Sequence, residues 1–124
     1  MGLDNFASRI PDDLILTEDD LKAFEEASID LCGGILSGEG SSFRGKVYSA
    51  LIEKVTGISL YDEWIPPETV KSMSEILSKY TAEELFMIIN KVSAYDIHTE
   101  KTMASLQRFF QICAKRGLGI IGWS

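Results

Sequence analysis

A glycine-rich run followed by a lysine is the part of this sequence that most resembles a chemical site. In the stretch GSSFRGK, Gly40, Gly45 and Lys46 have the GxxxxGK spacing of a phosphate-binding loop. Such a loop works because backbone N–H groups at a helix start point at the phosphate, the Lys reaches its outer oxygens, and a following Ser or Thr ligates magnesium. The residue after Lys46 is Val47, which has no oxygen for a metal ion. The spacing therefore predicts a possible anion contact and argues against nucleotide hydrolysis.

The surroundings of this run weaken the nucleotide interpretation further. The preceding stretch IDLCGGILS is a poor buried strand, and no alternation of strands and helices follows it. Three alternatives stay open. A serine caps a helix while the two basic side chains face solvent, or the run holds a phosphate or carboxylate without hydrolysing it, or it belongs to a nucleotide-dependent enzyme. The predicted ligand-binding residues are Ser41, Ser42, Arg44 and Lys46.

The remaining chemically capable residues do not form a recognisable set. His98, the single histidine, is flanked by Asp96 and Glu100. Positions two apart on a helix point in different directions, so an exposed or capping histidine is favoured over a metal ligand or general base. Cys32 and Cys113 form no metal-binding or CxxC pattern, which favours reduced, buried thiols, with a Cys–His nucleophilic pair as the alternative. No catalytic residue, metal ligand or cofactor is predicted.

An acidic and aromatic loop is the second candidate surface. Tyr61 and Trp64 lie in the stretch YDEWIPP. Tyrosine and tryptophan give a large contact area at little entropic cost, so such loops often form binding surfaces. Tyr61 and Trp64 are therefore predicted to face a protein partner.

Charge is distributed unevenly along the chain. The formal net charge is −7, and residues 1–40 hold ten acidic and two basic residues, a net −8, whereas residues 101–124 hold four basic residues and no acidic one. An acidic domain repels a phosphate backbone, which disfavours nucleic-acid binding. The basic residues Lys101, Arg108 and Lys115 recur every seven positions. They form a solvated face, a complement to the acidic first helix, or a surface for a partner.

Hydrophobic periodicity predicts a mainly α-helical fold in one domain, residues 1–124. Thr81 with Glu84 has the spacing of a capping box, and Gly57 suits a left-handed helix end. The apolar tail LGIIGWS is too short for a helix and is expected to add a strand beside residues 14–16, 33–36 or 58–61. About five helices are predicted, over residues 17–30, 42–57, 66–80, 81–92 and 96–116.

Targeting signals are not evident. The longest apolar runs, such as LFMII and LGIIGW, are far shorter than the ~20 residues that cross a bilayer. The start MGLDNFASRIPDD lacks the apolar core of a secretory signal. A cytoplasmic protein without a membrane partner is expected.

Several segments carry a resemblance to other proteins. The opening MGLDNFASR, followed by DLCGG, SSFRGKVY and LYDEWIPP, resembles a group of short prokaryotic proteins with no assigned function, over most of roughly the first 70 residues. The resemblance implies an intracellular microbial protein that is complete at this length. It implies no activity, ligand or site residue.

These observations lead to three functional hypotheses. The first is a non-catalytic binding or regulatory module, because no set of nucleophile, base and orienting group can be assembled. The second is a small enzyme that binds a nucleotide or phosphate ligand at Ser41, Ser42, Arg44 and Lys46. The third is an acidic inhibitor or immunity-type protein that blocks a basic partner. The sequence does not determine the oligomeric state.

Overall fold

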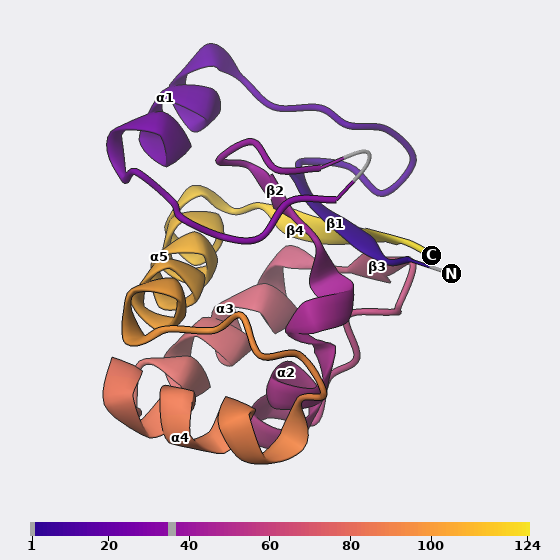
Figure 1. The fold of residues 1–124 in the computed structure, drawn as a ribbon. Coiled ribbons are helices and arrows are strands. Elements are labelled where there is room, and N and C mark those ends of the chain that lie inside the picture. Colours follow the sequence, from indigo (N-terminus) through magenta and orange to yellow (C-terminus); the bar gives the residue numbers. More distant parts are fainter. Residues whose placement is uncertain (1, 35–36) are drawn as a thin grey trace.

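The computed structural model of the chain describes residues 2–34 and 37–124. Within these residues, α-helices dominate and a small antiparallel sheet lies beside them (Figure 1). This architecture confirms the predicted mainly α-helical fold with a minor β element. The helices are α1 (Glu18–Glu26), α2 (Ser49–Thr56), α3 (Pro67–Leu77), α4 (Ala82–Val92) and α5 (Glu100–Arg116), with a 3₁₀ turn at Gly45–Val47. The strands are β1 (Asp4–Ser8), β2 (Ser42–Phe43), β3 (Trp64–Ile65) and β4 (Gly119–Trp123).

Local capping chemistry sets most helix ends. Thr81 and Glu84 form the predicted capping box of α4, and Gly57 ends α2 in the left-handed conformation at φ 76°. Four predicted ends are wrong. Helix α2 begins at Ser49 rather than near residue 42, and α3 ends at Leu77 rather than at residue 80. Helix α1 ends at Glu26 rather than near residue 30, and Ser28 just beyond it has a positive φ of 51°. Helix α5 begins after the cap Thr99 rather than near residue 96.

The predicted C-terminal strand forms, but its main neighbour is not among those expected. Strand β4 pairs along its whole length with β1, and the strand order is β2-β1-β4-β3. Of the expected partners, residues 14–16 and 33–34 form no strand, and residues 35–36 lie outside the described residues. The stretch from residue 58 joins the sheet only at Trp64. Strand β1 was missed because Asp4, Asn5 and Ser8 are residue types depleted in strands or without strand preference.

Residues alternate between the two faces of the sheet. Ala7 and Ile120 point towards the helices and belong to the main hydrophobic core with Phe109 of α5. The register places Phe6 opposite Ile121 on the other face, where the ring of Phe6 lies 5.0 Å from that of Trp123. Figure 1 shows α2, α3 and α4 gathered below the sheet and α1 above it. The outer face therefore keeps apolar side chains that the helices do not cover.

A buried carboxylate connects the N-terminal part of the chain to the last helix. The side chain of Asp20 in α1 is fully buried. It accepts hydrogen bonds from Arg9 Nε at 2.7 Å and Nη2 at 2.8 Å, and from Arg116 Nε at 2.7 Å. The backbone N–H of Thr17 donates to it at 2.9 Å. Burial alone would raise the pKa of Asp20, but the hydrogen bonds from Arg9, Thr17 and Arg116 outweigh burial and hold it well below its usual range.

No helix in the described part of the chain combines the length and hydrophobicity required to cross a lipid bilayer.

Replacing Asp20 by Asn is expected to lower the free energy of unfolding by about 3 kcal/mol, because the two guanidinium groups lose their charged partner. Denaturant unfolding measures the change, and Asp19→Asn, an exposed neighbour on α1, is the control with an expected loss below about 1 kcal/mol. Since the folded pKa of Asp20 is depressed, its stabilisation is present above the unfolded value of 3.8 and declines as the pH falls below it. Equal losses in the two variants would contradict the assigned role of Asp20.

Candidate functional site

The two predicted serines do not stand at a helix start. Ser42 belongs to strand β2, and α2 begins only at Ser49. The hydroxyl of Ser42 accepts from the N–H of Gly38 at 3.2 Å, and its own N–H donates to Glu39 at 2.9 Å. The prediction that Ser41 or Ser42 caps the second helix is therefore wrong. The glycine-rich run forms a short edge strand instead.

The backbone donors of the run are mostly engaged within the fold. The N–H of Arg44 donates to the carbonyl of Cys32 at 2.8 Å, and that of Lys46 donates to Leu3 at 3.3 Å. The guanidinium of Arg44 packs close to the backbone of Gly2 and of Gly34. A phosphate loop needs several free N–H groups that point at one spot. The anion contact at Ser41, Ser42, Arg44 and Lys46 stays a prediction, and this geometry gives it little support.

Gly45 has a packing reason that is independent of any phosphate. A Cβ on Gly45 would lie 1.6 Å from Oδ1 of Asn5, far inside contact distance. Asn5 is fully buried and its amide nitrogen donates to the carbonyl of Leu60 at 3.0 Å. Gly45 thus allows the backbone to pass close to the side chain of Asn5. That side chain in turn links β1 to the segment before β3.

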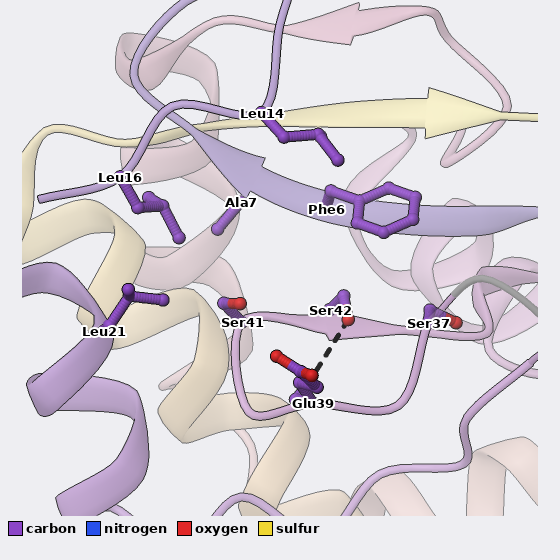
Figure 2. A pocket seen from close by; sticks show the side chains of 9 residues that line it. All are labelled: Phe6, Ala7, Leu14, Leu16, Leu21, Ser37, Glu39, Ser41 and Ser42. Atoms are coloured by element: carbon purple, nitrogen blue, oxygen red, sulfur yellow. Dashed lines mark hydrogen bonds between the residues drawn. The ribbon is translucent and has the colours of Figure 1, made fainter.

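A cavity lies beside β1, where it is lined by Phe6 of the outer face and Ala7 of the core face. It has a volume of about 510 Å³. Figure 2 shows apolar side chains from β1, from the loop after it and from α1 on one side, and polar side chains from the segment around β2 on the other. A cavity of this size lies in the range that accommodates ligands or several side chains. It is lined by Phe6, Ala7, Leu14, Leu16, Leu21, Ser37, Glu39, Ser41 and Ser42.

Leu21 adjoins two smaller depressions as well as the cavity, because it lines all three. One depression lies along α1 and the other lies between α1 and Gly40. The side chain of Leu21 is 47% exposed, and that of Leu14 is 42% exposed. The spacing of Leu21 and Phe24 predicts that both belong to one buried apolar stripe of the first helix. Phe24 is buried as this spacing predicts, but Leu21 is not, so the prediction is wrong for Leu21. We refer to the cavity and the two depressions together as the Leu21 groove.

The two predicted partner residues behave differently. Tyr61 is 45% exposed in the turn before β3. Trp64 is only partly exposed, because its ring lies against the backbone of Gly119, where a Cβ would approach it to 2.3 Å. Its register opposite Ile121 places it on the same outer sheet face as Phe6. The structure thus brings Trp64 and Ser42 to one face of the sheet, while Arg44 and Lys46 lie away from the cavity.

His98 is neither exposed nor a cap, which corrects the prediction. Its side chain is 8% exposed and its ring centroid lies 5.4 Å from that of Tyr48. Nε2 contacts the hydroxyl of Ser93 at 3.4 Å, and Nδ1 has no hydrogen-bond partner among the described residues. Burial lowers the pKa of His98, and the backbone of Val47 offsets only part of that effect.

The cysteines are free thiols in the structure. Cys113 is fully buried in α5, and burial raises its pKa, while Cys32 is partly buried beside the glycine-rich run. Within residues 2–34 and 37–124, no three His, Cys, Asp or Glu side chains gather as a metal site would require.

Apart from Ser41 and Ser42, the residues of the Leu21 groove were not found by sequence reasoning. They come from β1, the loop at residues 9–16, α1 and the segment around β2, and no single stretch carries a recognisable motif. One local signal existed, since Leu14 and Leu16 form an apolar patch between the acidic pairs of PDDLILTEDD. An apolar patch between acidic residues outside any predicted helix indicates either a core anchor or an exposed contact.

Comparisons with protein-family models, with curated proteins and with solved structures find no match to this chain.

Replacing Gly45 by Ala is expected to lower the free energy of unfolding by about 1–3 kcal/mol, because the new methyl group would overlap Asn5. Thermal or denaturant unfolding measures this loss. A double-mutant cycle with Asn5→Ala should show a smaller loss for Gly45→Ala once Oδ1 is gone. The neighbouring substitution Lys46→Ala should change stability by about 0.5 kcal/mol or less. Strictly additive effects at Gly45 and Asn5 would contradict the packing explanation.

Acidification is expected to destabilise the fold through His98. The pKa of His98 in the folded chain lies below the unfolded value of 6.5. As the pH falls below 6.5, the unfolded chain therefore binds a proton at His98 more readily than the folded chain does. The free energy of unfolding should fall with decreasing pH by at most about 1.4 kcal/mol per pH unit from this group. Unfolding curves of wild type and His98→Gln between neutral and mildly acidic pH isolate it, since the carboxylates are common to both. Parallel curves would show that His98 does not titrate in this way.

Proposed function

We propose that this chain is a non-catalytic binding module that holds a segment of another protein in the Leu21 groove. The observation that carries the proposal is the exposure of Leu14 and Leu21 in the apolar wall of a cavity. Single exposed apolar side chains are common on protein surfaces, but apolar side chains gathered around a hollow mark interaction sites. A partner that inserts an apolar side chain there would remove both leucines from water.

The walls of the groove are built before any partner arrives. One wall is β1, whose backbone is paired on both sides by β2 and β4. The other walls are the loop at residues 9–16 and α1, which Asp20 ties to Arg9 and Arg116. The N–H of Arg9 donates to the carbonyl of Ile15 at 2.9 Å, which closes the loop on itself. A groove that is rigid before binding loses less conformational entropy when it is occupied.

The phosphate or nucleotide enzyme has less support from the structure. Ser41 and Ser42 line the cavity, but the two basic side chains predicted to act with them do not. The cavity also receives the carboxylate of Glu39, which would repel a phosphate. The groove therefore favours a protein segment over an anionic ligand.

Selection from a random peptide library on the immobilised protein tests the proposal. Peptides that bind the groove are expected to lose affinity by about tenfold or more for Leu21→Ser, because a central apolar contact is removed. Isothermal titration calorimetry measures the affinities. Because Leu21 is half exposed, the substitution should leave the fold intact.

Met87→Ser is the matched control for this selection. Met87 on α4 is 55% exposed and lies outside the groove. Peptides should bind this variant as they bind wild type. If selected peptides tolerate Leu21→Ser, or if none is selected, the groove is not the binding surface.

A further inference from the structure

We propose that the segment bound by the Leu21 groove is cationic, with apolar side chains for the cavity and flanking lysine or arginine residues for its rim. This inference rests on the proposed function and adds the chemistry of the partner. The acidic half of the groove lies along α1, where Glu18, Asp19 and Glu25 line the depression around Leu21. Glu39 from the opposite wall lines both the cavity and the depression next to it. The apolar floor is thus bordered by carboxylates on two sides.

These carboxylates are available to a partner. The ion pairs among residues 2–34 and 37–124 join Asp20 to Arg9, Asp20 to Arg116, and Asp30 to Lys101. None of these ion pairs involves the four acidic residues that border the groove, which we call the rim: Glu18, Asp19, Glu25 and Glu39. The single basic residue that lines the groove is Lys22. The guanidinium of nearby Arg9 donates its hydrogen bonds to Asp20, so it forms no ion pair with the rim carboxylates.

The carboxylates of the groove are placed to attract a positively charged partner before it makes contact. Four carboxylates along the groove outnumber its one lysine, Lys22, and produce a local potential that attracts positive charge and repels acidic segments. An acidic peptide would therefore be rejected even if its apolar side chains fitted the cavity. Rim charges act mainly on the association rate and on partner choice, while the apolar contacts at Leu14 and Leu21 hold the complex.

A second copy of this chain is an alternative occupant of the groove, because the chain also has a basic surface. Helix α5 carries Arg108 and Lys115 on its exposed surface. However, apolar side chains on the α5 surface are few, since Met103, Leu106, Phe109 and Phe110 are all buried in the core. A basic face without an apolar anchor would not fill the cavity, so the groove favours a different protein.

Three labelled synthetic peptides of equal length test the inference. One alternates lysine and leucine in an amphipathic helical pattern, one replaces each lysine by glutamate, and one replaces each leucine by serine. Fluorescence anisotropy should show that the lysine–leucine peptide binds far more tightly than the other two, and that added salt weakens it. Leu21→Ser should weaken it by about tenfold.

Variants in which carboxylates are replaced by amides show whether the peptide is attracted by the rim or by the overall acidity of the protein. The groove variant is Glu18→Gln, Asp19→Asn, Glu25→Gln and Glu39→Gln. The matched control has the same change in net charge elsewhere on the surface, at Glu53→Gln, Glu68→Gln, Glu75→Gln and Glu83→Gln, all of them exposed. The groove variant should lose about tenfold or more in affinity for the lysine–leucine peptide, and the control variant about threefold or less.

Each of the remaining outcomes would overturn either the proposed function, the cationic partner, or both. Equal losses in both variants would show nonspecific attraction, and the inference would fail. Binding of the glutamate–leucine peptide that is lost in Leu21→Ser would keep the proposed function and overturn the cationic partner. Lysine–leucine binding that is insensitive to Leu21→Ser would overturn both. Dimerisation that sedimentation detects and Leu21→Ser abolishes would assign the groove to a second copy of the chain.

Discussion

The Asp20 carboxylate is the contact on which the arrangement of the N-terminal part depends. A buried carboxylate is stable only when charged partners and hydrogen bonds replace the water that it has lost. Arg9 follows β1 directly and Arg116 is the last residue of α5, so one side chain fixes the end of a strand, the start of α1 and the end of α5. Helix α1 buries only Asp20 and Phe24, and it could not hold this position through apolar contacts alone. The groove exists because this polar anchor keeps α1 at the side of the sheet and leaves Leu21 uncovered.

The alternation of β1 explains why the sheet has two different surfaces. Its central position between β2 and β4 buries all five residues, yet their side chains point in opposite directions. Ala7 joins the helical core, whereas Phe6 faces outward and is shielded by Trp123 and the adjacent loop. A shift of the register by one residue would send Phe6 into the core and Asn5 out of it. The close approach of Gly45 to Asn5 opposes that shift, which connects the glycine of the GxxxxGK run to sheet register rather than to phosphate.

Sequence reasoning captured the features that depend on neighbouring residues and missed those that depend on distant ones. Caps such as Thr81 with Glu84, and left-handed ends such as Gly57, act within a few residues, so their spacing alone predicted them. Strand β1 was missed because its stability comes from pairing with β4, more than a hundred residues later. Leu21 was misplaced for a related reason. Periodicity predicts that a helix has an apolar face, but not how much of that face another element covers.

The excess of acidic residues in the first third of the chain has two separate roles. Glu18, Asp19 and Asp20 stand in the first turn of α1, where the helix dipole stabilises negative charge. Asp20 alone turns inward, and its two arginines offset its charge inside the fold. The four rim carboxylates make no ion pair in the described structure, and Lys22 is the single basic residue beside them, so the groove keeps an excess of negative charge. A cationic segment in the groove would neutralise that charge and cover the exposed leucines in the same step. Charge and hydrophobic exposure thus favour the same kind of occupant.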